Sequence, residues 1–204
     1  MDAHRIIIIF TGMSSIESAA ILAGGKNLRF NRQIKSLAIL KGKSLLDHQL
    51  MTLNTFFNEI LLITNHPEAF NKYDSCRIFR DLIPGRGPLS GIHTALTKAS
   101  SKNVFIVAGD MPFINLQTIG ELIKHWQENQ DKAVVPRMGD KPEPLHAIYP
   151  GNILESMENW LKHSPDQSVR AFLKHIPVCY RDFSDPTPFI NINTPQELRR
   201  YEAD

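Results

Sequence analysis

The sequence of 204 residues is poor in cysteine, with only Cys76 and Cys179 and no Cys-x-x-Cys pair. A disulfide framework is therefore not expected, and a reducing cytoplasm is the expected location. Hydrophobic runs are short, and none approaches the roughly 18 apolar residues that a membrane span needs. The formal net charge is only +2, which is too small to indicate nucleic acid as a partner. We therefore expect neither a membrane nor a nucleic-acid partner.

Several common catalytic motifs are missing as well. No serine lies in a Gly-x-Ser-x-Gly segment, and no Gly-x-Gly-x-x-Gly follows an apolar run. The eight histidines are dispersed without metal-ligand spacing, which argues against a structural zinc site. The composition is otherwise that of an ordinary globular protein, with 42% hydrophobic and 22% charged residues.

The length suits one sizeable domain over residues 1–204, in which residues 1–16 form an N-terminal extension of unassigned role. Within that extension, a charge precedes the apolar residues 6–10, as in a signal peptide. The apolar core is too short and no small-residue cleavage site follows, so export is not expected. An extra edge strand is one alternative for this segment, and a start at Met13 with a dispensable leader is the other.

Short apolar runs alternate with helical patterns along the chain. This alternation of buried strands and helices predicts an α/β fold with a mostly parallel central sheet and helices on both faces. A polar loop is expected over 137–144. Strands are predicted near 19–23, 60–64, 77–80, 104–108, 133–136, 145–149, 178 and 189–191, and helices near 44–53, 89–98, 116–128, 152–162, 168–174 and from Pro195 onward.

The first predicted strand ends in Leu22-Ala23-Gly24-Gly25, and Arg29 and Lys35 follow at irregular spacing. A glycine backbone can approach a phosphate or a base closely, and its N–H groups are free to donate hydrogen bonds. Basic side chains just beyond such a loop would add positive charge around phosphates. The pattern predicts a nucleotide site. A strand followed by a glycine turn and a solvated basic loop would show the same residues.

Polar residues follow the other predicted strands, and ligands of parallel sheets bind beyond the carboxyl ends of the strands. Asp110 ends the strongest strand, where a carboxylate can hold a divalent cation that bridges nucleotide phosphates. Asn65 and Asp81 can contact a purine, with the carboxylate accepting from the N1–H and N2 amine of guanine. All of these residue types are also common in turns.

Two further segments precede helices. Gly87 lies before Pro88, at a helix start whose free N–H groups could face an anion, or could simply end a turn. Asn191 and Asn193 precede a helix that Thr194 can cap, so capping does not explain the two amides. Asn193 could complete a metal or phosphate site.

Together these segments resemble the molybdenum cofactor guanylyltransferases, which are nucleotidyltransferases with a Rossmann-like sheet. The resemblance extends from Ile21 to Leu198 and depends on the order and spacing of many short blocks rather than on one motif. These blocks are 22–25 with Arg29 and Lys35, 40–48, Asn65, Asp81, 87–91, 109–112, 143–145 and 189–195.

The resemblance implies that GMP is transferred from GTP to the terminal phosphate of molybdopterin, with Mg²⁺ as cofactor and pyrophosphate released. Proteins that carry molybdopterin or mature molybdoenzymes are then candidate partners. The implied catalytic residues are Arg29, Lys35 and Asp110, with Asp110 also the metal ligand. The implied GTP-binding residues are Leu22, Ala23, Gly24, Gly25, Lys35, Asn65, Asp81 and Gly87, and the implied molybdopterin-side residues are Asn191 and Asn193.

The Gly24-Gly25 pair is similar to the guanylyl branch of the family, whereas the cytidylyl branch more often has Ala-Gly. The chain departs from the family pattern between Arg29 and Lys35. It has Phe30-Asn31 where Met-Gly is usual, and Ile34 where an Asp usually precedes the lysine. The alternatives are a nucleotidyltransferase that uses CTP or a sugar phosphate, and a nucleotide-binding module without catalysis.

Overall fold

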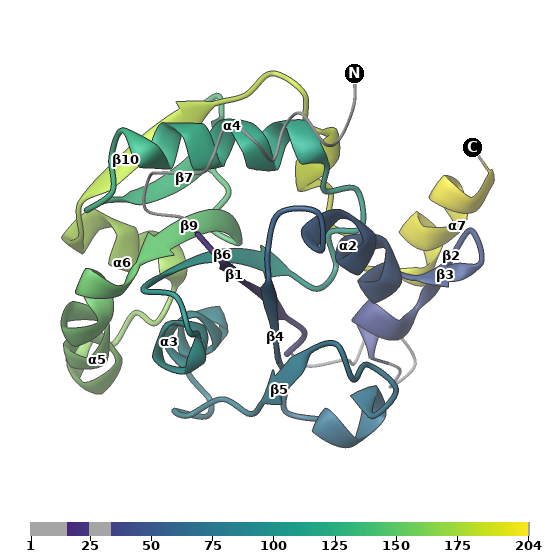
Figure 1. The fold of residues 1–204 in the computed structure, drawn as a ribbon, viewed down its shortest axis with the longest axis horizontal. Helices are drawn as coiled ribbons and strands as arrows, with labels where there is room; N and C mark the ends of the chain where they lie inside the picture. Colours follow the sequence, from purple (N-terminus) through teal and green to yellow (C-terminus); the bar gives the residue numbers. More distant parts are fainter. Residues whose placement is uncertain (1–15, 25–33, 204) are drawn as a thin grey trace.

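A computed structural model describes residues 16–24 and 34–203 (Figure 1). The first strand, β1 (Ser18–Leu22), lies near the middle of a sheet of eight strands. The sheet order is β10-β7-β9-β6-β1-β4-β5, and β8 pairs with β7. The other strands of this sheet are β4 (Glu59–Ile63), β5 (Arg77–Phe79), β6 (Asn103–Ala108), β7 (Ala133–Met138), β8 (Lys141–Pro142), β9 (His146–Pro150) and β10 (Val178–Asp182).

Parallel pairing dominates the sheet, as the sequence predicts. β1 is parallel to both β4 and β6, β4 is parallel to β5, and β7 is parallel to β10. The antiparallel pairs are those of β9 with β6 and β7, and of β8 with β7. Because β9 runs against both of its neighbours, β6 and β7 point the same way, and the carboxyl ends of β1, β4, β5, β6, β7 and β10 share one edge.

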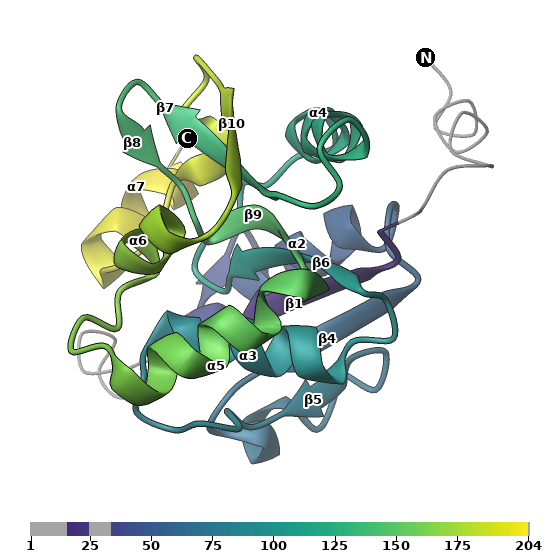
Figure 2. The ribbon, with the colours of Figure 1, turned by 90° about the vertical axis from the view of Figure 1, so that its left-hand side faces the viewer.

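Helices cover both faces of the sheet (Figures 1 and 2). On one face lie α2 (Leu45–Leu53) and α4 (Leu116–Gln127), and on the other lie α3 (Pro88–Lys98), α5 (Leu154–His163) and the short α6 (Val169–Phe172). α7 (Pro195–Ala203) packs near a small hairpin of β2 (Ile39–Leu40) and β3 (Lys43–Ser44). Short 3-10 helices lie at Lys35–Leu37, Pro67–Phe70, Gly151–Ile153, Leu173–His175 and Thr187–Phe189.

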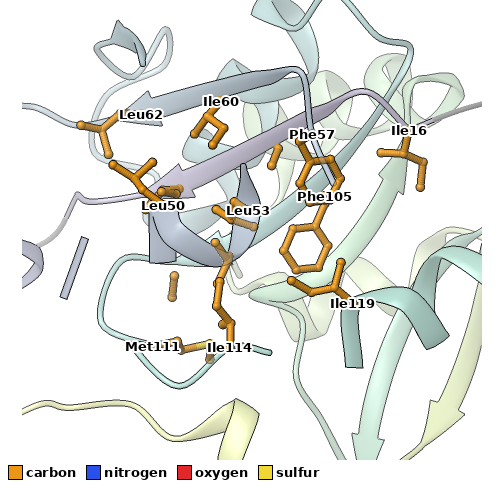
Figure 3. Packing of buried hydrophobic residues seen from close by; sticks show 14 of the residues in the cluster. Ile16, Leu50, Leu53, Phe57, Ile60, Leu62, Phe105, Met111, Ile114 and Ile119 are labelled. Carbon is orange, nitrogen blue, oxygen red and sulfur yellow. The ribbon is translucent and has the colours of Figure 1, made fainter. Parts of the chain in front are cut away.

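Side chains of the central strands alternate between two hydrophobic cores. In β1, Ala19 and Ile21 belong to the core under α2 and α4, whereas Ala20 belongs to the core under α3 and α5. Phe105 of β6 joins the first core, where it packs among Ile60 and other residues drawn in Figure 3. The apolar runs of the sequence are therefore strands that are buried on both faces.

The predicted elements agree with the structure except in two places. The polar segment 137–144 is not only a loop, because β7 continues into it and turns at Gly139, which has φ 57°, to pair with β8. The strand predicted at 189–191 is absent from this described segment, since a 3-10 helix ends at Phe189 and irregular backbone follows. Ile192 N–H donates instead to the carbonyl of Asp110 at 2.8 Å.

α2 begins where the sequence predicts, at a capping box. The Ser44 hydroxyl accepts from the Asp47 N–H at 3.0 Å, and the Asp47 carboxylate accepts from the Ser44 N–H at 3.0 Å. These bonds satisfy backbone donors that a helix start would otherwise leave free. Among the described residues, no helix is both long enough and apolar enough to cross a membrane.

Candidate nucleotide-transfer site

A cavity of about 630 Å³ opens beyond the carboxyl ends of β1, β4 and β6. In the sheet, β1 lies between β4 and β6. The chain passes from β1 through α2 to β4 on one side of β1, and β6 lies on its other side, so the connections at the carboxyl end of β1 run in opposite directions. Such divergence leaves a crevice at the sheet edge. Nine residues predicted for the site line this cavity: Leu22, Ala23, Gly24, Lys35, Asn65, Asp81, Gly87, Asp110 and Asn191.

Three further residues are predicted for the site, namely Asn193, Gly25 and Arg29. Asn193 contacts Lys35 at the cavity through its side-chain oxygen. Gly25 and Arg29 lie outside the described residues, as does the 30–33 part of the segment that departs from the family pattern.

Lys35 links two distant parts of the chain at the cavity. Its Nζ donates to Asp110 Oδ2 at 3.1 Å and to Asn193 Oδ1 at 2.8 Å. The Lys35 and Asp110 side chains are 24% and 19% exposed, so solvent still reaches the pair. These two bonds therefore connect Lys35 to the end of β6, which carries Asp110, and to the segment before α7, which carries Asn193.

The first and sixth strands end very close together at the base of the cavity. Gly109 N–H donates to the Leu22 carbonyl at 2.9 Å, and Ala23 N–H donates to the Ile63 carbonyl at 2.8 Å. A Cβ atom at Gly109 would lie 3.2 Å from both Ala23 Cα and the Leu22 carbonyl oxygen. A side chain at Gly109 would force these strand ends apart, which explains why glycine precedes Asp110.

α3 directs its N-terminus at the cavity. Gly87 occupies the position before the helix with φ 65° and ψ −157°, a conformation that is essentially restricted to glycine. Pro88 follows as the first helical residue and has no N–H of its own. The Ser90 N–H donates to the Gly87 carbonyl at 3.1 Å, so the start of α3 offers an anion in the cavity mainly the positive end of the helix dipole.

Asn65 and Asp81 come together on the opposite wall of the cavity. Asn65 Nδ2 donates to Asp81 Oδ2 at 3.0 Å, and this bond uses neither Asp81 Oδ1 nor Asn65 Oδ1. Burial raises the pKa of Asp81, and the hydrogen bond from Asn65 opposes that rise. The pair presents acceptors to the cavity, as the recognition of a guanine edge requires.

Sequence reasoning missed several residues at this site. Four of them, Pro88, Gly91, Gly109 and Leu145, lie within the blocks that carry the family resemblance, which was the available signal. Glu143 lies two residues before Leu145, and burial raises its pKa against the opposing charges of Arg170 and Lys141. The missed residues that line the cavity are Ser36, Ile63, His66, Gly85, Pro88, Gly91, Ala108, Gly109 and Leu145.

The cavity residues supply few side chains that could bind a metal ion. Within residues 16–24 and 34–203, no group of three or more His, Cys, Asp or Glu side chains could hold a metal ion. Asp110 and Asn193 nevertheless supply oxygen atoms beside an ammonium group. Magnesium is commonly bound by one or two carboxylates together with waters and substrate phosphates. The residues present therefore fit a magnesium–nucleotide complex and do not fit an all-protein metal cage.

The chain is similar to known proteins over most of its length. The family model described as "MobA-like NTP transferase domain" matches residues 19–179. A protein of Syntrophotalea carbinolica named molybdenum cofactor guanylyltransferase is 33% identical over 191 residues, covering 90% of each chain. A protein of Peptoclostridium acidaminophilum named "Probable molybdenum cofactor guanylyltransferase" is 36% identical over 205 residues, covering 93% of this chain and 90% of its own.

A solved structure has the same fold. The molybdopterin-guanine dinucleotide biosynthesis protein A from Archaeoglobus fulgidus superposes with a TM-score of 0.78 at 26% identity. The match covers 91% of this chain and 97% of that chain.

Proposed function

The chain belongs to the family of MobA-like NTP transferase domains, and we propose that it transfers GMP from GTP to the terminal phosphate of molybdopterin. The observation that carries this proposal is the junction of Lys35 with Asp110 and Asn193 at a cavity that nine predicted residues line. We also propose that residues 1–204 form a single nucleotidyltransferase domain, with residues 1–16 as an extension.

In the proposed reaction, an oxygen of the molybdopterin phosphate attacks the α-phosphorus of GTP. The bond from the α-phosphorus to the bridging oxygen breaks, and pyrophosphate leaves with that oxygen and its electron pair. The attacking phosphate is already anionic at neutral pH, so no general base is needed. The main task of the protein is to hold two repelling phosphates in line and to offset their charge.

Each group at the cavity has a part in this task. The Lys35 ammonium would bind phosphate oxygens, the positive end of the α3 dipole would face them, and the 22–24 backbone would contact the nucleotide. Asp110 would hold Mg²⁺ together with the phosphates, and Asn191 and Asn193 would lie on the molybdopterin side. When bound, Mg²⁺ would supply positive charge that stabilises the phosphate oxygens and the leaving pyrophosphate. Arg29 is proposed as a further cation for the phosphates.

Asn65 and Asp81 account for the preference for GTP. A carboxylate accepts from both the N1–H and the N2 amine of guanine, whereas cytosine presents acceptors at its N3 and O2 atoms. The unused oxygen of Asp81 would therefore attract guanine and repel the corresponding edge of cytosine. Because burial raises the pKa of Asp81, a bound guanine also replaces the solvation that this carboxylate has lost.

Calorimetry with GTP, CTP and ATP in the presence of Mg²⁺ tests base selection, with the strongest binding expected for GTP. Pyrophosphate release with molybdopterin as acceptor tests turnover, and omission of Mg²⁺ should abolish it. Stronger binding of CTP would overturn the guanylyl assignment. Binding of GTP without turnover would instead favour a nucleotide-binding module.

A further inference from the structure

Gln49 of α2 connects this helix to the loop that carries Asp110. Its side chain is fully buried, and its Nε2 donates to the Ala108 carbonyl at 2.7 Å and to the Met111 carbonyl at 3.0 Å. The two carbonyls flank Gly109 and Asp110 on either side. Both amide hydrogens of Gln49 therefore hold the backbone that presents the Asp110 carboxylate to the cavity.

A glutamine at this buried position costs free energy that an apolar side chain, which would fill the same space, would not. Gln49 Oε1 is buried and has no hydrogen-bond partner among the described residues, and an orphaned buried acceptor costs about 1–3 kcal/mol. An apolar side chain of the same length would avoid that cost. It would, however, remove the Gln49 donor from the Met111 carbonyl, which precedes Pro112. The amide is thus better explained by its two backbone partners than by filling space.

α2 is a firm support for these bonds. The helix starts at the capping box of Ser44 and Asp47, and Leu50 and Leu53 bury its inner face. Figure 3 shows Leu50 and Leu53 above Met111 and Ile114 of the 109–115 loop. All four belong to one hydrophobic core, so the loop packs on the same helix that Gln49 anchors.

Two other backbone bonds of this loop go to parts of the site itself, and a third, from the Met111 N–H to the Ala108 carbonyl at 3.2 Å, lies within the loop. Gly109 N–H donates to the Leu22 carbonyl, and the Asp110 carbonyl accepts from the Ile192 N–H. Those partners belong to segments that the substrates would contact. Gln49 is different because its own backbone lies in a helix behind the cavity, so it can fix the loop independently of what the cavity holds.

We propose that Gln49 is a positioning residue for the transfer reaction: it holds residues 108–111 so that the Asp110 carboxylate stays aligned with Lys35 and the phosphates. The proposal depends on the role proposed above for Asp110. Side chains that orient a metal-binding or catalytic group commonly change affinity or activity by about 10- to 100-fold when they are removed.

The test replaces the amide by a side chain of similar length without donors, in Gln49→Met. We expect kcat to fall at least tenfold while the KM for GTP changes less than about twofold. Titration of Mn²⁺ with GTP, followed by electron paramagnetic resonance, should show an affinity at least about fivefold weaker. Amide hydrogen exchange at Gly109 and Met111 should become faster, since their N–H bonds to the Leu22 and Ala108 carbonyls lose the support of the Gln49 amide.

Thr52→Val is the matched control, because Thr52 lies on the same helix and donates to the Ile114 carbonyl at 3.4 Å, beyond Pro112. It should leave Mn²⁺ affinity and exchange at Gly109 unchanged. Gln49→Asn, which keeps the amide but shortens its reach, replaces Gln49→Met if the latter does not fold. Equal behaviour of the Gln49 and Thr52 variants in all three measurements would overturn the proposal.

Failure of the proposed function would look different. If Asp110→Asn retained both transfer and Mn²⁺ binding, the role of Asp110 would be wrong, while exchange at Gly109 and Met111 would still report whether Gln49 holds the loop. If Asp110→Asn lost transfer but Gln49→Met kept normal kcat and Mn²⁺ affinity, only the positioning role would be overturned.

Discussion

The two ends of the central strands differ in how completely their polar groups are paired. At the carboxyl ends, the cavity is lined by charged and polar side chains that make few bonds to one another. At the amino ends, Glu59 accepts from the Ser18 hydroxyl at 2.5 Å, from the Ser100 N–H at 2.8 Å and from the Ser100 hydroxyl at 2.8 Å. Arg77 donates to the same carboxylate.

The net pKa shifts of the carboxylates at the two ends are opposite in direction. Burial raises the pKa of Glu59, but the hydrogen bonds from Ser18, Ser100 and Arg77 outweigh it and leave the pKa at about 2. Burial also raises the pKa of Asp81 in the cavity, where Asn65 is the one opposing partner. A saturated carboxylate stabilises the fold, whereas an undersatisfied one has capacity left for a ligand. The paired carboxylate at the amino ends is thus suited to stabilising the fold, and the carboxylate at the carboxyl ends is suited to the ligand binding proposed above.

The largest expected effect is that of Asp110→Asn. The substitution keeps the size of the side chain but removes the charge that would hold Mg²⁺, so transfer should fall at least about a hundredfold. Initial rates of pyrophosphate release measure this, and the melting temperature should stay within a few degrees. Unchanged activity would remove Asp110 from the site and break the contrast between the two ends.

Glu59→Gln is expected to act in the opposite way. Loss of the charge weakens bonds from three partners, and hydrogen bonds to charged groups contribute about 1.5–3 kcal/mol each, so the free energy of unfolding should fall by about 2–3 kcal/mol. Urea denaturation measures the loss, and kcat should be unchanged in the folded enzyme.

Glu68→Gln is the control for Glu59. The Glu68 carboxylate is 63% exposed and pairs with the equally exposed Arg80, so its loss should leave the free energy of unfolding nearly unchanged. Equal effects of the Glu59 and Glu68 substitutions on unfolding would contradict a stabilising role for the amino-end network.

Lys35→Ala should reduce kcat at least tenfold, which corresponds to about 1.4 kcal/mol of transition-state stabilisation. The ammonium lies between Asp110 and Asn193, where phosphates are expected. Lys43→Ala, which removes the same charge at an exposed position beside Met51, should leave the rate unchanged. A loss below twofold for Lys35→Ala would count against its role at the phosphates.

A further prediction concerns the pH dependence of stability. His146 is fully buried against Phe105 and Phe189, at ring distances of 5.3 and 5.0 Å. Burial lowers its pKa from 6.5 to about 3, so below pH 6.5 the unfolded chain binds a proton that the folded chain does not. Stability should fall with a slope approaching about 1.4 kcal/mol per pH unit as the pH drops from 6.5 towards 3.

The Glu59 contribution has a different window. Its pKa is lowered from 4.5 to about 2, so that contribution is complete above pH 4.5 and is lost as the pH falls below it. Urea denaturation between pH 6.5 and 4.5 therefore leaves out the Glu59 contribution, and comparison of the wild-type protein with His146→Leu separates His146 from Asp81 and Glu143, whose pKa values burial raises. His146→Leu should flatten the slope in this range, and an unaltered slope would show that another group is responsible.

Most of the fold was predictable because local patterns and burial agree. The apolar runs at 60–64 and 104–108 became β4 and β6, and the Ser44 capping position starts α2 as predicted. The strand predicted at 189–191 was wrong because its apolar residues pack around irregular backbone that bonds to Asp110. Apolar character alone does not distinguish a strand from a buried loop.

The candidate site was only partly predictable. Residues that follow strands, such as Asn65, Asp81 and Asp110, could be placed at one edge of the sheet by the rule for parallel strands. Ser36, His66 and Gln49 could not, since nothing in their neighbouring residues distinguishes them from ordinary surface or core positions. Gln49 in particular looks like one polar residue within an amphipathic helix, and only its two carbonyl partners give it a role.

The α/β class, the position of the glycine-rich strand end and the chemical groups proposed for nucleotide transfer follow from the order of residues along the chain. Local propensity and hydrophobic spacing suffice for these features. The contact of Lys35 with Asp110 and with Asn193, which lies 158 residues further along the chain, follows instead from the packing of distant segments. The same holds for Gln49 and its loop. Such contacts depend on how strands and helices pack, which no local spacing of residues encodes.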